Sequence, residues 1–273
     1  NSSYLTLHGW LAKMDITGKN MRYLAALCER ILFDKLFPAR CIVCQGAVRH
    51  GTGRRSSDIC AGCLDEMPRN EHCCPRCAVP LASEYSNGDH PNGVLCGRCI
   101  RQPPAFDYSY SLFRYEGSIV SLIHQLKFSP KIGHARSLGT LLAESSAEYI
   151  KKNGAPDGLL PVPLHRRRLR QRGFNQSSEL ARSLASICSC PVLFDEVERG
   201  RKTESQTGLN AKQRKKNIRG AFTLASEVTF DHVLIIDDVV TTGSTVNELA
   251  RLLKKTGVKR VGVLSVARAP MKQ

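Results

Sequence analysis

The sequence predicts an α/β protein, in which a parallel β-sheet flanked by helices follows a small cysteine-rich region. Three observations predict this class. Short apolar segments alternate with amphipathic ones after residue 104, as is typical of parallel sheets with helices on both faces. Eight of the 12 cysteines form pairs with two residues between them, all before residue 100. No apolar run reaches the ~18 residues of a membrane-spanning helix.

We divide the 273 residues into three parts. An N-terminal extension with a helix covers 1–37, the cysteine-rich region covers 38–103, and the α/β domain covers 104–273. A chain of this length fits one medium-sized domain and one small one.

The N-terminus lacks the basic flank and the long apolar core of a secretory signal peptide. We therefore expect a cytoplasmic protein without membrane insertion. The chain begins with Asn1, and Met14 and Met21 are both candidate translation starts. Whether 1–20 is an unstructured upstream extension or part of the folded protein stays open.

Strands and helices alternate along the α/β domain. The segment 106–115 alternates like a strand, and 118–128 follows as an amphipathic helix. The apolar face of that helix consists of Ile119, Leu122, Ile123 and Leu126. Further helices are expected at 137–152 and 175–187, and further strands at 158–163, 191–194, 232–236 and 260–267.

The helix predicted at 245–257 has the clearest boundaries. Thr245 and Glu248 have the spacing of a capping box at its start. Gly257 can end it in the left-handed conformation. The apolar face of this helix consists of Val246, Leu249, Ala250 and Leu253.

Positive charge is concentrated in one stretch. The net charge of the chain is +16, and between Pro161 and Gly220 there are 14 Lys and Arg against 5 Asp and Glu, a net charge of +9. Such a basic region suits a phosphorylated small molecule, nucleic acid or both. The alternative is a solvated surface without a phosphate-bearing partner.

The paired cysteines have the spacing of structural zinc sites. Fifteen residues separate the first two pairs and eighteen separate the last two, which fits two closed sites with four thiolates each. The alternatives are a disulfide framework, which needs an oxidising compartment, and a cross-braced arrangement that mixes the blocks. Cys73 has the wrong spacing for a ligand, and Cys28, Cys188 and Cys190 are expected to be buried apolar residues. The predicted ligands are Cys41, Cys44, Cys60 and Cys63 for one Zn²⁺, and Cys74, Cys77, Cys96 and Cys99 for the other.

Two adjacent aspartates follow the apolar strand in "VLIIDDVVTTGST", which runs from Val233 to Thr245. The hydroxyls and backbone N–H groups of 241–245 can surround a phosphate at a helix N-terminus. Asp237 and Asp238 would repel a phosphate, but each can accept a hydrogen bond from one of two neighbouring ribose hydroxyls. The stretch therefore predicts a site for a ribose 5-phosphate.

Two other interpretations of this stretch are weaker. A strand that holds Mg²⁺ in a nucleotide triphosphatase needs a GxxxxGK[ST] loop, which the sequence lacks. An ordinary strand–turn–helix would seldom place paired aspartates at the end of a buried strand.

The stretch resembles the signature of the type I phosphoribosyltransferases, which bind 5-phosphoribosyl 1-diphosphate with Mg²⁺. The chain resembles the ComF family, including GntX-like proteins, in the order of its motifs. These are the cysteine pairs, "HQLKF", "PVPLHRRRLRQRGFNQ", "ESQTGLNAKQRKKNIRGAF" and the signature. This resemblance covers about Cys41 to Arg268. It implies a type I phosphoribosyltransferase-like fold after the ribbons, and a mobile loop over the substrate at 201–218.

The resemblance also implies roles for individual residues. Asp237 and Asp238 would hold the ribose, and Arg172 would stabilise the leaving pyrophosphate. The 5-phosphate would contact Thr241, Thr242, Gly243, Ser244 and Thr245. Asn175, Gln176 and Lys127 would also reach phosphate groups, although Lys127 can equally be a lysine at a helix end with its charge in solvent.

Two functions are compatible with these features. One is a phosphoribosyltransferase with a nitrogen nucleophile as acceptor, although no residue can be assigned as the general base. The other is a non-enzymatic accessory role in handling single-stranded DNA, which the ComF resemblance links to natural competence and DNA uptake. Proteins of the competence machinery are further candidate partners.

Overall fold

The computed structural model describes residues 39–48, 58–82, 93–128, 132–200 and 218–271. The predicted extension at 1–37 and nearly all of the predicted loop at 201–218 lie outside these residues. Among the described helices, none is both long and apolar enough to span a membrane. The predicted boundaries between 37 and 38 and between 103 and 104 stay predictions.

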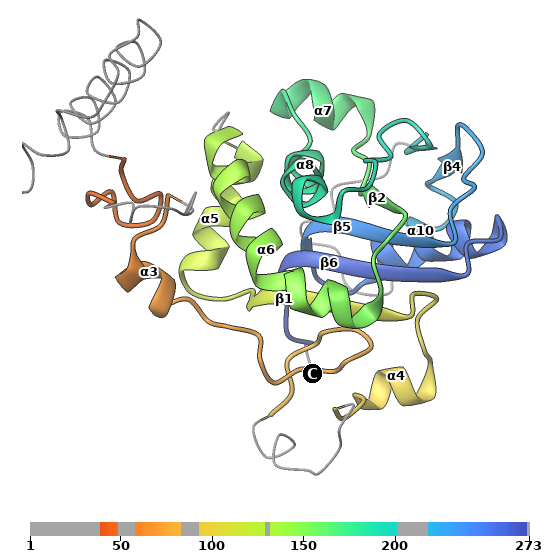
Figure 1. Cartoon of the computed structure of the whole chain (residues 1–273), viewed down its shortest axis with the longest axis horizontal. Coiled ribbons are helices and arrows are strands. Elements are labelled where there is room, and N and C mark those ends of the chain that lie inside the picture. Colours follow the sequence, from red (N-terminus) through yellow and green to blue (C-terminus); the bar gives the residue numbers. More distant parts are fainter. Residues whose placement is uncertain (1–38, 49–57, 83–92, 129–131, 201–217, 272–273) are drawn as a thin grey trace, which may run out of the picture.

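A four-stranded parallel sheet forms the centre of the α/β region (Figure 1), with the strand order β1-β6-β5-β2. The strands are β1 (Tyr108–Arg114), β2 (Gly158–Pro161), β5 (His232–Val240) and β6 (Arg260–Arg268). A separate antiparallel pair consists of β3 (Val197–Glu198) and β4 (Thr223–Leu224). The central strands β5 and β6 are apolar and buried on both faces, as parallel sheets require.

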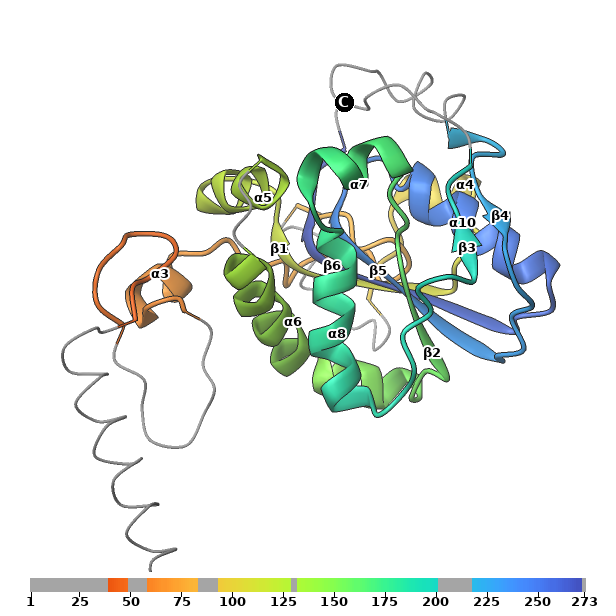
Figure 2. The ribbon, with the colours of Figure 1, turned by 90° about the horizontal axis from the view of Figure 1, so that it is seen from above.

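Helices cover both faces of this sheet. The helices α5 (Ser118–Phe128), α6 (Ile132–Asn153) and α8 (Gln176–Cys188) lie on one face, and α10 (Ser244–Lys255) lies on the other (Figure 2). Side chains alternate accordingly along β5. Leu234 and Ile236 belong to the core under α6 and α8, while Val233 and Ile235 belong to the core under α10.

The cysteine-rich region divides between these two cores. Its first part contains α3 (Ala61–Asp65), and its second part contains α4 (Gly97–Arg101). Cys41 and Ile42 pack into the core of α5, α6 and α8, whereas Cys74 and Cys96 pack into the core of α10. The two parts therefore pack into different cores, and the first lies beside α5 and α6 (Figure 1).

The segment that joins the two parts covers the outer edge of β1. Arg69 forms an antiparallel bridge with Phe113. The N–H of Asn70 donates to Leu112 O at 3.1 Å, and the N–H of Arg114 donates to Pro68 O at 2.8 Å. This pairing satisfies backbone groups that an open edge strand would expose.

The structure corrects several predicted boundaries. The helix expected from 137 already begins at Ile132, and an additional helix, α7 (Arg166–Arg172), occupies the basic stretch before α8. The strand expected at 191–194 is only a single parallel bridge between Val192 and Leu159. β5 extends to Val240 because its ladder with β6 continues past the predicted end.

The predicted capping box of α10 is wrong. Gly243, at a φ of 75°, is the N-cap, and the helix begins at Ser244 without a side-chain cap. Glu248 instead accepts the N–H of Gly220 at 2.8 Å. Gly257 does adopt the predicted left-handed conformation, with a φ of 96°.

The ring of Tyr108 lies against β6 where Gly262 leaves space. A methyl group at Gly262 would lie 2.8 Å from Leu234 Cδ1 and closer still to the Tyr108 ring. The ring is held in place because the Tyr108 hydroxyl and His232 Nε2 are hydrogen-bonded at 2.8 Å.

Gly262→Ala is therefore expected to lower the free energy of unfolding by about 1–3 kcal/mol, as overpacking of a core does. Chemical denaturation measures this. Gly133→Ala, at an exposed helical position with no atom within 4 Å of the added methyl group, should change stability by no more than about 1 kcal/mol. Equal effects of the two substitutions would contradict the packing argument.

Candidate functional site

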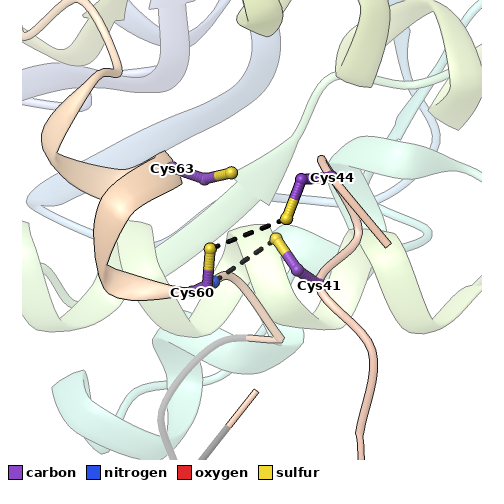
Figure 3. A group of neighbouring side chains, drawn as sticks. All are labelled: Cys41, Cys44, Cys60 and Cys63. Carbon is purple, nitrogen blue, oxygen red and sulfur yellow. Dashed lines mark hydrogen bonds between the residues drawn. The ribbon is translucent and has the colours of Figure 1, made fainter. Parts of the chain in front are cut away.

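The first cysteine cluster brings four sulfur atoms together (Figure 3). Cys41 and Cys44 lie in a turn, and Cys60 and Cys63 lie at the start of α3. All four sulfur atoms lie within 4.8 Å of one another, and the sulfur atoms of Cys44 and Cys60 are 3.7 Å apart. This spacing is far too long for a disulfide bond of about 2.05 Å. It fits the edge of a tetrahedron with metal–sulfur bonds of about 2.3 Å.

The second cluster repeats this design inside the core. Cys74, Cys77, Cys96 and Cys99 are all buried, and the sulfur atoms of Cys77 and Cys96 are 3.7 Å apart. A hydrogen bond from the Cys77 thiol is the main cause that lowers the pKa of Cys74, the direction that favours the thiolate form that binds metal. The two clusters are arranged in series along the chain, which excludes the cross-braced alternative.

The turns that carry the first cysteine pair of each cluster share one backbone conformation. Gln45, at a φ of 63°, follows Cys44, and Ala78, at a φ of 53°, follows Cys77. Their N–H groups donate to Cys41 O at 2.9 Å and to Cys74 O at 2.7 Å. A left-handed conformation costs a non-glycine residue about 1–2 kcal/mol. Its presence in both turns fits residues that a bound metal holds in place.

The remaining described cysteines lie outside both clusters. Cys73 is not a member of either group, as its spacing predicted. Cys188 and Cys190 pack against the apolar core, as predicted, but they are half-buried rather than buried. They lie at and just beyond the end of α8. Cys28 lies outside the described residues.

The aspartate pair lies within the last residues of β5, at the carboxyl end of the sheet. Each carboxylate accepts a hydrogen bond from the next backbone N–H, at 2.9 Å for Asp237 and 2.7 Å for Asp238. The hydroxyl of Ser177 also donates to Asp237 at 3.3 Å. Burial, followed by the neighbouring Asp238 charge, raises the pKa of Asp237 well above its usual range.

A basic side chain from α5 contacts one of these carboxylates. Lys127 Nζ lies 3.1 Å from Asp238 Oδ2, so this lysine points into the site rather than into solvent. Burial lowers the pKa of Arg172, and the Asp238 charge opposes that shift. The contact that places a cation on the carboxylate pair is therefore that of Lys127 at the end of β5.

The segment before α8 positions these groups. Asn175 caps α8 by accepting the N–H of Ser177 at 3.1 Å, and it donates to Val162 O at 3.1 Å. Gln176 donates to Leu126 O at 2.8 Å and accepts from Arg172 at 3.1 Å. In this structure both amide groups thus donate to main-chain carbonyls and hold the segment against β2 and α5. A contact with a diphosphate stays a prediction for them.

The hydroxyl-rich loop connects β5 to the start of α10. The hydroxyls of Thr242 and Ser244 are hydrogen-bonded at 2.9 Å, and the Ser244 N–H donates to Thr242 Oγ1 at 3.3 Å. Thr241, Gly243 and Thr245 are half-buried in the same loop. The positive φ of Gly243 turns the chain into the helix. With no side-chain cap, the N-terminus of this 12-residue helix suits an anion.

Comparisons with known proteins agree with both halves of the structure. The double zinc ribbon domain matches residues 32–101, and the phosphoribosyl transferase domain matches residues 169–273. The DNA utilization protein YhgH of Salmonella typhimurium is 37% identical over 212 residues, which cover 77% of this chain and 90% of that protein. The competence protein F of Haemophilus influenzae is 33% identical over 238 residues, which cover 85% of this chain and 98% of that protein.

The chain belongs to the ComF family. A more distant relative, the competence protein ComFC of Bacillus subtilis, is 26% identical over 218 residues, which cover 73% of this chain and 79% of that protein. In this member of the ComF family, the parallel sheet with its helices has the phosphoribosyltransferase fold, and the cysteine-rich region is a double zinc ribbon. Both parts of the predicted fold class are confirmed, and the two cysteine clusters, each able to hold one metal ion, lie within the double zinc ribbon.

Several side chains that contact the aspartate pair, the hydroxyl-rich loop or the second cysteine cluster were not predicted from the sequence. Arg268 is 2% exposed, and its guanidinium donates to the carbonyls of Cys77, Val240, Thr241 and Ala269. Arg98 donates to Thr242 O at 2.9 Å, and Ser177 bonds Asp237. In the sequence, Arg268 directly follows the apolar run of β6, and this position indicates that the arginine is buried. Nothing local in the sequence distinguishes Arg98 or Ser177.

Each zinc cluster is expected to bind one ion, so the purified protein should contain two Zn²⁺ per chain. Cys60→Ser and Cys96→Ser should each lower the zinc content to about one, as elemental analysis measures. Cys96→Ser should lower the melting temperature more, because its cluster is buried in the core of α10. Cys73→Ser is the matched control and should retain both ions. A zinc content that stays at two in both ligand variants would refute the assignment.

Proposed function

We propose that this protein binds 5-phosphoribosyl 1-diphosphate with Mg²⁺ at the end of β5. The observation that supports the proposal is the carboxylate pair of Asp237 and Asp238, directly before a hydroxyl-rich loop at a helix N-terminus. The carboxylates accept hydrogen bonds from the two ribose hydroxyls. The loop 241–245 binds the 5-phosphate through its hydroxyls and N–H groups.

The diphosphate lies on the side of the two cations. Lys127 is close enough to the carboxylates to contact a ligand bound there, Arg172 is held by Gln176 at the start of α8, and both would neutralise phosphate charge. Asn175 and Gln176 keep the segment 172–176 in place and offer further contacts when the diphosphate binds. Mg²⁺ supplies additional positive charge when it arrives with the diphosphate.

Transfer of the ribosyl group would break the bond between the anomeric carbon and the diphosphate oxygen. The bond electrons leave with the pyrophosphate, which Arg172 stabilises, and positive charge develops on the ribose near Asp237 and Asp238. A nitrogen nucleophile then forms the new bond to carbon. Because no general base is assigned among the described residues, binding and turnover are separate hypotheses.

The names of the relatives suggest a biological setting. The competence protein F and the DNA utilization protein YhgH align with most of this chain. We propose a role in natural competence and DNA uptake, with proteins of the competence machinery as candidate partners and the cytoplasm as the proposed location.

Calorimetric titration of the zinc-loaded protein with 5-phosphoribosyl 1-diphosphate and Mg²⁺ should show saturable binding. The double substitution Asp237→Asn, Asp238→Asn should weaken it at least tenfold, because a hydrogen bond to a charged group contributes about 1.5–3 kcal/mol. Asp231→Asn, at the exposed opposite end of β5, is the control and should bind like the parent. Undiminished binding by the folded double variant would exclude this site.

The second candidate function is a non-enzymatic role as a single-stranded DNA-binding accessory protein. The basic helix α7 favours it, because Arg166, Arg167 and Arg170 are exposed on one short element. A surface of this kind suits the closely spaced phosphates of a strand.

Binding of a labelled oligothymidylate should weaken steeply as salt rises, with a log–log slope of about −0.7 for each phosphate contacted. Arg166→Gln, Arg170→Gln should reduce both the affinity and this slope, as fluorescence anisotropy measures. Lys151→Gln, Lys152→Gln, at the exposed last turn of α6, removes the same charge and should have little effect. Affinity that is independent of salt would remove the electrostatic basis of this function.

A further inference from the structure

A cavity lies between the second zinc cluster and the outer face of α10. The described residues around it enclose about 560 Å³, a volume typical of small-molecule sites, which span about 300–1,000 Å³. One wall consists of α4 and the segment that follows it. The other walls consist of α10 and residues 218–222.

This cavity is distinct from the proposed ribose site. Neither Asp237 nor Asp238 lines it, and neither Lys127 nor Arg172 does. It meets the phosphate loop only at 242–244, from the side of the zinc ribbon. A ligand in the cavity would therefore lie beside the 5-phosphate position without occupying the ribose position.

The charge of the lining favours an anion. Five basic residues from four segments line it, namely Arg98, Arg219, Arg251, Lys255 and Arg268, and of these Arg268 already donates to backbone carbonyls. Glu248 is the one carboxylate among the described lining residues. That carboxylate already accepts from the Gly220 N–H at 2.8 Å and from Arg251 at 3.3 Å. The balance of charge is therefore positive.

Apolar groups complete the lining. Phe106 and Phe222 are 3% and 5% exposed, and Pro104 and Leu252 extend the apolar surface. A cavity with an apolar surface and a cationic rim fits a ligand that has a flat ring and an anionic group. A nucleoside phosphate has both.

The walls of the cavity are held at a fixed separation. Arg98 donates to Thr242 O at 2.9 Å, and the Ala105 N–H donates to Asn247 Oδ1 at 2.7 Å. Lys254 also pairs with Asp107 at 2.7 Å. These contacts join the ribbon and its following segment to α10 and the phosphate loop. The cavity is therefore preformed, which lowers the ordering cost of binding.

We propose that this cavity is a second binding site, which accepts a nucleoside phosphate as a free nucleotide or as the terminal unit of a single strand. The phosphate contacts the basic side chains of α10 and α4, and the base lies on the apolar surface. The site does not depend on turnover at Asp237 and Asp238.

The probes are thymidine monophosphate, titrated by calorimetry, and a short labelled oligothymidylate, followed by fluorescence anisotropy. Both are measured with and without saturating 5-phosphoribosyl 1-diphosphate and Mg²⁺, so that the ribose site can be blocked. The test variant is Arg251→Gln, Lys255→Gln, which alters the exposed side of α10 and leaves the cysteines and the phosphate loop unchanged. The control is Lys151→Gln, Lys152→Gln, with the same change of charge.

The cavity variant is expected to bind at least one probe about three- to tenfold more weakly, and the effect should persist with the ribose site blocked. Its salt slope for the oligothymidylate should become shallower by about 1.4, because two phosphate contacts are lost. Competition by thymidine monophosphate would identify a free nucleotide as sufficient, whereas binding of the oligothymidylate alone would identify a strand.

Equal losses in the cavity variant and the control, or no loss in the cavity variant, would overturn the proposal. Titration of the cavity variant with 5-phosphoribosyl 1-diphosphate should give the parent affinity. This readout separates failure of the cavity proposal from failure of the ribose site, and an unchanged zinc content and melting temperature confirm that the variant is folded.

Discussion

The buried guanidinium of Arg268 is the interaction on which the arrangement of the two halves depends. A cation removed from water requires acceptors for its N–H groups, and Arg268 finds them in two regions. It donates to Cys77 O in the second zinc cluster and to the carbonyls of Val240 and Thr241 at the end of β5. The metal-binding turn and the start of the phosphate loop are thereby fixed to one side chain, and Arg98 adds a second link from α4 to Thr242.

The central sheet explains why the zinc ribbon cannot be treated as an independent appendage. Because β5 and β6 are apolar on both faces, each face needs a cover. The helices α5, α6 and α8 cover one face, and the first cluster joins their core, while α10 shares the other face with the second cluster. Loss of metal from the second cluster would therefore expose part of the core that positions the phosphate loop.

Local features could be predicted from the sequence, and distant contacts could not. The cysteine spacing and the apolar run before Asp237 depend on neighbouring residues, so both clusters and the presence of β5 were predicted correctly, although β5 continues past its predicted end to Val240. The capping box failed because Gly220, from another segment, takes the Glu248 carboxylate. The role of Arg268 depends on Cys77, 191 residues away, and that of Arg98 depends on Thr242, 144 residues away. The hydrophobic periodicity of the sequence does not indicate contacts between residues so far apart.

The position of β6 between β1 and β5 has a consequence for the order in which the molecule can assemble. β1 has its ladder partner in β6, and Ser111 and Ser265, which face each other there, are 154 residues apart. Contacts this distant form late, whereas each cysteine cluster closes a short loop. During synthesis on the ribosome, the ribbons can acquire metal while β1, paired on one edge with residues 68–70, still lacks β6 on the other. The nascent chain would then pass through a stage with folded ribbons and one open edge of β1, at which chaperones are most needed.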